Sequence, residues 1–138
     1  MLRVVRLLAA MWLVHAISAC QIVKEDRESW LIGTSIVTLL AHPSDYDGIH
    51  VQTKGFLSNE GSPALFLTRD HAMVHDVPSA IPLTVSDEKL GPFRNSGCFD
   101  KYVSVVGRFV VEHEYVGKSI KVQTVRDALS TRTCWRED

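Results

Sequence analysis

Cysteine is scarce in this 138-residue chain, and neither sign of charge is in excess. The three cysteines include no Cys-x-x-Cys pair, the spacing that redox centres and structural zinc sites commonly use, so the sequence supports neither kind of site. Lysine and arginine number 15 against 16 aspartate and glutamate residues. A general nucleic-acid-binding protein is basic, because neutralisation of phosphates supplies most of its affinity. We therefore expect no nucleic-acid partner.

Recognisable catalytic and cofactor motifs are also lacking. The sequence has no Gly-x-Ser-x-Gly element, and its glycines do not form a phosphate-binding loop. Hydrophobic residues make up 46% of the chain and charged residues 22%, which are ordinary values for a globular protein, and the length suits one domain with a real core. We expect a protein that is not an enzyme and that carries no cofactor.

The first 19 residues are typical of a signal peptide. Arg3 and Arg6 precede an apolar run over residues 7–18, which is short for a membrane-spanning helix. The sequence ISAC, residues 17–20, resembles the bacterial lipoprotein signal, in which an aliphatic residue and two small residues precede a cysteine. The alternative is an anchor that stays uncleaved.

The lipoprotein resemblance implies that residues 1–19 are removed and that Cys20 carries lipid. Gln21 follows the cysteine in place of aspartate, which under the sorting rule of enteric bacteria implies the periplasmic face of the outer membrane. Residues 20–29 would then form a lipidated tether, and residues 30–138 the folded domain. Removal of the leader takes away Arg3 and Arg6 and no acidic residue, so the formal net charge changes from −1 to about −3.

The other two cysteines form an even pair once Cys20 is assigned to lipid. In an oxidising compartment we expect Cys98 and Cys134 to form a disulfide. Such a bridge would stabilise the fold by about 4 kcal/mol, because it lowers the entropy of the unfolded chain. Two unpaired thiols are the alternative.

Five segments of alternating or apolar pattern predict strands. Glycines interrupt the first and fourth segments at Gly55 and Gly107, and a glycine inside a strand often marks a bulge or bend. Pro82 in the third segment favours an edge position, because proline cannot donate to a sheet ladder. The predicted strands are residues 49–58, 64–68, 80–85, 101–111 and 119–128.

The segments between the strands complete the pattern. A short helix is expected over residues 35–42, where the proline at position 43 ends it, and a helical turn over residues 69–77. Residues 86–100 are expected to form a long loop. A mainly β fold follows, a five-stranded Greek-key barrel like the OB-fold, with a short N-terminal helix and a helical turn.

A family resemblance supports the same fold. The stretch TLLAHPSDYDGIHVQTKGFLS, residues 38–58, resembles the start of a family of small bacterial OB-like proteins, and the resemblance continues through residues 64–72 and 101–110. It covers roughly residues 35–125. The family has no assigned activity, so the resemblance implies a fold and little chemistry.

The candidate binding groups are aromatic and histidine side chains. Phe56 and Phe66 are expected in the core, whereas Tyr102 and Arg108 share the outward face of the fourth strand and form the candidate binding patch. His71 and His75 stand four residues apart, which on a helix places both imidazoles on one side. Solvated histidines are the simpler interpretation, so no metal ligand is assigned.

These observations predict a non-enzymatic lipoprotein of the cell envelope that binds a protein or a polymer. The lipid anchor would hold it at a membrane, and its partner would be another envelope protein or an envelope polymer. One alternative is an immunity-type lipoprotein that neutralises a toxin in the periplasm. A second alternative is metal binding through the histidines.

Overall fold

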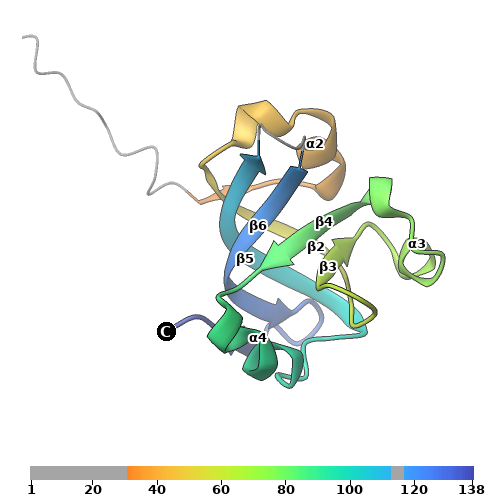
Figure 1. Ribbon diagram of the computed structural model, residues 1–138, viewed down its shortest axis with the longest axis vertical. Coiled ribbons are helices and arrows are strands. Elements are labelled where there is room, and N and C mark those ends of the chain that lie inside the picture. The colour runs from red at the N-terminus through yellow and green to blue at the C-terminus, as the bar shows by residue number, and fades with distance from the viewer. Residues whose placement is uncertain (1–30, 113–116) are drawn as a thin grey trace, which may run out of the picture.

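The computed structural model describes residues 31–112 and 117–138. The predicted signal peptide, Cys20 and the tether lie outside the described residues. The elements in chain order are β1 (Ile32–Gly33), α2 (Ile36–Ala41), η2 (Pro43–Tyr46), β2 (His50–Ser58), β3 (Ala64–Phe66), α3 (Arg69–Met73), η3 (Val77–Ser79), β4 (Ala80–Thr84), α4 (Asp87–Arg94), β5 (Lys101–Glu112), β6 (Gly117–Asp127) and β7 (Thr133–Arg136) (Figure 1).

Five of the strands close into a barrel. Neighbouring strands follow the order β2-β3-β4-β6-β5, and β5 pairs again with β2. The β4–β6 pair is parallel and the other barrel pairs are antiparallel. Two extra strands extend the sheet, with β1 on β2 and β7 on β6. The predicted OB-fold-like barrel is therefore confirmed.

Helices close the two ends of this barrel (Figure 1). The Ser35 side chain caps α2 by accepting a hydrogen bond from the Thr38 N–H at 3.0 Å, and Ile36 and Leu39 are buried. At the other end α4 buries Phe93 completely. The interior between them is filled by the inward side chains of the strands, among them Val51, Leu57, Leu65, Ile81, Val103, Val105, Phe109, Ile120 and Val122.

Both strand glycines lie where the chain cannot accept a side chain. A Cβ atom at Gly55 would lie 2.5 Å from the carbonyl oxygen of Phe66 and 2.5 Å from Cδ1 of Ile36. A Cβ atom at Gly107 would overlap the carbonyl oxygen of Lys121 on β6. The β5–β6 register shifts between Val106 and Gly107, which agrees with the bulge or bend expected at a glycine inside a strand.

Three local expectations are corrected by the structure. Residues 86–100 contain α4 in addition to loop, even though Pro92 lies inside the helix. The tail contains β7, which was not predicted. Strand β4 is not an edge strand, because it lies between β3 and β6. Pro82 is accommodated because it pairs with Ala64 on β3, whereas pairing with β6 involves only Leu83 and Thr84.

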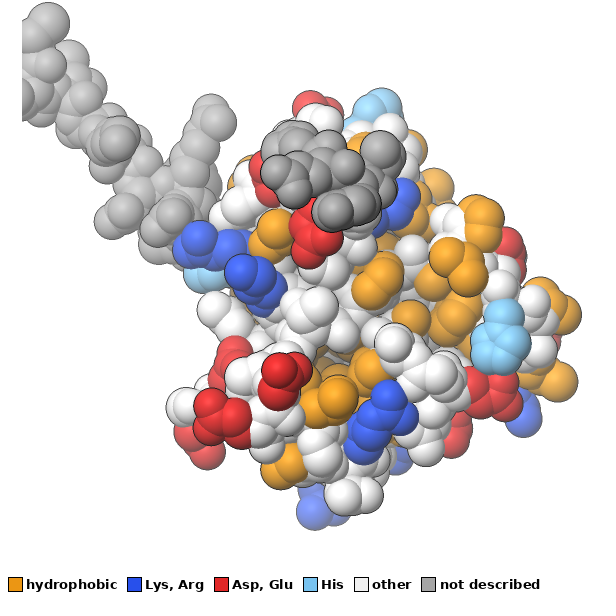
Figure 2. Space-filling view, in the orientation of Figure 1, with side chains coloured by type: hydrophobic (Ala, Val, Ile, Leu, Met, Phe, Trp, Pro, Cys, Tyr) orange, Lys and Arg blue, Asp and Glu red, His pale blue; other side chains and the backbone are white. Residues whose placement is uncertain are grey.

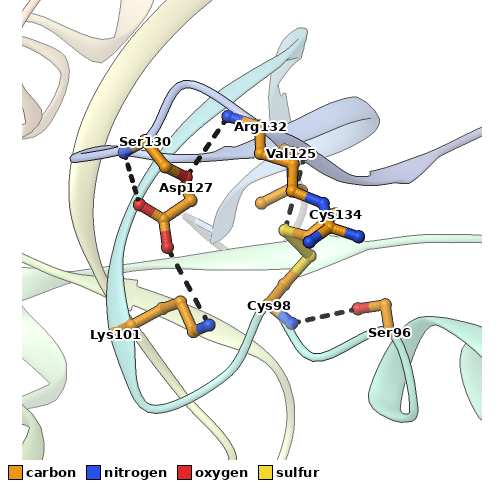
Figure 3. The surroundings of a disulfide bond; sticks show 8 residues. All are labelled: Ser96, Cys98, Lys101, Val125, Asp127, Ser130, Arg132 and Cys134. Atoms are coloured by element: carbon orange, nitrogen blue, oxygen red, sulfur yellow. Dashed lines mark hydrogen bonds and ion pairs between the residues drawn. A yellow bond between two sulfur atoms is a disulfide. The ribbon is translucent and has the colours of Figure 1, made fainter.

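A disulfide joins the loop after α4 to β7 (Figure 3). The sulfur atoms of Cys98 and Cys134 lie 2.11 Å apart, and the pairing is the one that the sequence predicts. Aromatic rings pack beside it, with the Phe93 ring centroid 4.9 Å from that of Trp135 and 5.1 Å from that of Phe99. The disulfide and this ring cluster together hold the C-terminal strand against α4.

Asp127 organises the turn between β6 and β7 (Figure 3). Its carboxylate accepts hydrogen bonds from the backbone N–H groups of Ser130 and Leu129, both at 2.9 Å, and lies 3.9 Å from the Lys101 ammonium. The hydrogen bond from the Ser130 backbone is the largest cause that lowers the pKa of Asp127 below 3.8, and the bond from the Leu129 backbone comes next.

This geometry predicts a pH dependence of stability. A carboxylate whose pKa is lowered by folding stabilises the native state above its ordinary pKa, and loses that contribution as the pH falls through the lowered value. We therefore expect Asp127→Asn to be less stable than the wild type at neutral pH and equally stable at about pH 2. Thermal unfolding followed by circular dichroism measures both. A difference that persists unchanged in acid would contradict the assignment.

Candidate functional site

The structure places the predicted patch residues far apart on β5. Tyr102 pairs with Phe56 and Arg108 pairs with His50, at opposite ends of the β2–β5 ladder. Six residues along a strand correspond to about 20 Å. The two side chains therefore do not form one patch, and their role in binding stays a prediction.

Tyr102 instead connects α3 to the barrel. Its side chain is 45% exposed, yet its ring packs edge-on against Phe56 with centroids 5.4 Å apart, and its hydroxyl accepts a hydrogen bond from the Arg69 N–H at 3.2 Å. Phe56 and Phe66 are buried, as predicted, and cluster with Ala72 of α3 and Ala80 of β4. This small cluster lies outside the barrel interior and fixes α3 against β2 and β3.

His71 lies in α3 and His75 follows the end of this helix. The two imidazoles therefore do not lie on one side of a helix, as their spacing of four residues would predict. The helix ends at Met73, and His75 adopts a positive φ of 49°. The Nδ1 atom of His71 lies 2.6 Å from the Thr68 hydroxyl, whereas Nε2 of His75 lies 2.8 Å from the Glu60 carboxylate. Metal binding here stays a hypothesis, which calorimetric titration with zinc or copper decides.

A groove of about 670 Å³ lies over the outer face of β3 and β4. Figure 2 shows hydrophobic side chains gathered over this part of the surface, between β4 and α3. Its walls come from the β2–β3 loop, from the segment that includes η3, and from the first residues of β6. The lining residues are Glu60, Gly61, Ser62, Pro63, Ala64, Phe66, His75, Val77, Pro78, Ala80, Pro82, Gly117 and Lys118.

The sequence of β3 and β4 explains why the surface is hollow here. Their outward positions form the cross-strand pairs Ala64–Pro82 and Phe66–Ala80. Three of these four side chains are small or compact. The surrounding loops therefore extend beyond them and leave a hollow over the two strands. An outward sheet face is ordinarily polar, whereas this one is apolar. The apolar outward positions of both strands are therefore a sequence signal that could have located the groove.

Few polar groups surround the groove. The Glu60 carboxylate and Nε2 of His75 lie 2.8 Å apart and join the β2–β3 loop to the segment before η3, and Lys118 lies at the start of β6. The Arg94 guanidinium of α4 donates a hydrogen bond of 2.6 Å to the carbonyl of Gly61, which holds the same loop from below. Val77 is 71% exposed at the groove wall. An apolar floor with a few charged groups at its margin is a typical arrangement for a binding site.

The described residues contain no group of three or more His, Cys, Asp or Glu side chains arranged to hold a metal ion. None of the helices within the described ranges is long and apolar enough to span a membrane.

Fold and groove together define a class of protein, the OB-fold-like barrels. Such barrels bind ligands on the face of their second and third strands and in the loops beside it, which in this chain are β3, β4 and the β2–β3 loop. Comparison with models of protein families, with curated proteins and with solved structures gave no match. The assignment to this class therefore rests on strand order, and the location of the site on the groove itself.

Proposed function

We propose that this protein is a non-enzymatic binding module of the bacterial cell envelope, which holds a segment of a partner protein in the groove over β3 and β4. The groove carries the proposal, because it is apolar, open to solvent and located where OB-fold barrels bind. The location of the site follows from the analogy with other OB-fold barrels.

The chemistry of the groove favours a protein partner over a sugar or a nucleic acid. Polysaccharides and single strands are usually bound by stacking on exposed aromatic rings, often with several cations. Among the residues that line the groove, the aromatic ring is that of Phe66, which is buried, and the lysine is Lys118. The exposed side chains of Val77, Pro78 and Pro82 instead fit aliphatic side chains of an extended segment, since burial of apolar surface drives such contacts.

The envelope location is supported by the leader and by the cysteines. The ISAC sequence resembles a lipoprotein signal, and the Cys98–Cys134 bridge suits an oxidising compartment. A lipid on Cys20 would keep the domain at a membrane, where its partner would be another envelope protein. A toxin that enters the periplasm is one such partner.

Substitution of Val77 tests the groove without disturbing the core. Because most of its side chain is exposed, Val77→Asp is expected to leave the unfolding temperature nearly unchanged. A carboxylate buried under an apolar partner segment should weaken binding at least about tenfold. The measurement is recovery of crosslinked partner from intact cells that express the full chain.

Leu129→Asp is the matched control. Leu129 is 94% exposed in the turn between β6 and β7, and it is not part of the groove lining. We expect this variant to recover as much crosslinked partner as the wild type. Equal recovery by all three proteins would contradict the groove as the binding site.

A further inference from the structure

A second surface of the barrel is strongly basic. Outward side chains of β2, β5, β6 and β7 form rows across the sheet, because the strands pair in a fixed register. One row contains His50, Arg108 and Lys121. The next contains Gln52, Val106, Thr124 and Arg136. A third contains Lys54, Ser104 and Arg126. We call this surface the basic face, defined by Lys54, Arg108, Lys121, Arg126 and Arg136.

No acidic side chain occupies any position in these three rows. Lys54, Lys121, Arg126 and Arg136 are exposed, and none of them forms an ion pair with another described residue. Glu137 borders the face beside Lys121. The whole chain has a formal net charge of −1, so the four exposed cations Lys54, Lys121, Arg126 and Arg136 on one face represent a marked separation of charge. Such a face attracts an anionic surface through space, over the Debye length.

The basic face and the groove lie on opposite sides of the barrel. In the ring β2-β3-β4-β6-β5, strand β5 lies at the centre of the basic face, and its neighbours are β2 and β6. The two remaining strands, β3 and β4, carry the groove. A surface bound by the basic face would therefore leave the groove open to a partner.

The N-terminal connection lies at the edge of the basic face. Strand β1 pairs with β2 at Ile32–Val51 and Gly33–Gln52, so the chain enters the domain beside the row that contains Gln52. Figure 2 shows lysine and arginine side chains gathered at the left edge of the described domain. The segment from Cys20 to Ile32 can extend over at most roughly 40 Å, so an anchor at Cys20 would keep the domain near the bilayer.

We propose that the basic face docks on the anionic phospholipid headgroups of the membrane that anchors the chain. The inference rests on the membrane anchor of the proposed function, but not on the groove or its partner. Its physical basis is charge complementarity together with the position of the tether. Docking would orient the groove away from the bilayer, toward proteins in the space beyond it.

The test uses the full chain reconstituted in vesicles through its N-terminal segment. A fluorescent amino acid replaces Gln52 in the basic face, and a quencher is attached to a minor fraction of the lipid headgroups. We expect quenching in phosphatidylcholine vesicles that contain about 30% phosphatidylglycerol to exceed that in pure phosphatidylcholine about fivefold, and to disappear in about 0.5 M salt. The same label at Val77 is expected to stay unquenched.

Two charge variants separate docking from net charge. Lys54→Gln/Lys121→Gln/Arg126→Gln should lose the quenching, because it removes three exposed cations from the basic face. The control Arg69→Gln/Lys89→Gln/Arg132→Gln removes the same charge elsewhere and should retain it. Equal loss in both variants, or equal quenching in neutral and anionic vesicles, would overturn the proposal. A third outcome is that the wild type binds a heparin column, the first variant does not, and vesicles cause no quenching. This result would overturn the proposal and indicate that the basic face binds a soluble polyanion.

Flotation of the vesicles at high salt distinguishes the two proposals. A chain that floats but is not quenched has an anchor and no docking surface, which overturns the inference and leaves the proposed function standing. A chain that does not float lacks the anchor, which overturns both the docking and the envelope location. Crosslinking of the partner through the groove is measured separately. Neither charge variant should change it if partner binding does not depend on membrane docking.

Discussion

Gly107→Ala is expected to destabilise the barrel by about 3 kcal/mol or more, and so to leave little folded protein at 37 °C. The added methyl group would overlap the backbone carbonyl of Lys121, which cannot move away without separating β5 from β6. That pair is the longest ladder of the barrel. Urea denaturation followed by circular dichroism measures the loss as a lower midpoint with a similar slope.

A matched glycine in another strand provides the control. Gly33 in β1 has no heavy atom within 4 Å of the position where its Cβ would lie. We expect Gly33→Ala to unfold at the wild-type urea concentration, within about 0.5 kcal/mol. Equal stability of Gly107→Ala and Gly33→Ala would contradict the claim that β6 lies too close to Gly107 for a side chain.

Loss of the disulfide is the second change with a large expected effect. Cys98→Ala/Cys134→Ala should lower the free energy of unfolding by about 2–5 kcal/mol, because the unfolded chain is no longer constrained between α4 and β7. The fully buried position of Cys98 adds a loss of packing against its neighbours. The measurement is the urea midpoint with and without reductant.

Reductant provides the internal control for this prediction. It should lower the midpoint of the wild type toward that of the double variant and leave the double variant unchanged. A wild type that is insensitive to complete reduction would show that the bridge contributes nothing to stability. Because only the bridge differs between the oxidised and reduced wild type, this comparison separates its effect from that of packing.

The barrel was predictable because its signals are local. Residues of β2 alternate before Gly55 and residues of β5 alternate over much of the strand, and the glycines mark the positions where neighbouring groups approach too closely for a side chain. The helix expected over residues 35–42, which the proline at position 43 ends, is likewise a local signal and corresponds to α2. Alternation depends only on which side of a sheet each residue faces, so it can be recognised in a single sequence.

The missed elements depend on tertiary contacts. Helix α4 contains Gly91 and Pro92, both of which favour loop in an isolated chain, and the burial of Phe93 stabilises the helix in spite of them. Strand β7 is four residues long, and it forms because β6 and the disulfide hold it. Neither contact leaves a periodic pattern in the sequence.

The candidate site was the least predictable part. The groove combines residues from the β2–β3 loop, η3, β3, β4 and β6, and only the closed barrel brings these segments together. The sequence pattern placed Tyr102 and Arg108 on one outward face, and their spacing of six residues already implies a separation of about 20 Å, but it could not show the contact of Tyr102 with α3. Contacts between residues on different strands depend on the pairing register, which cannot be derived from the sequence pattern.

Photo-crosslinking from single positions in living cells tests the central claim most directly. A photoreactive amino acid is placed at Val77 and, separately, at Pro82 in the groove, and at Leu129 and Val37 as exposed apolar positions elsewhere. The account predicts an adduct of one mass with the same partner protein from both groove positions, and none from the other two. Adducts that form only outside the groove, or equally from all four positions, would contradict it.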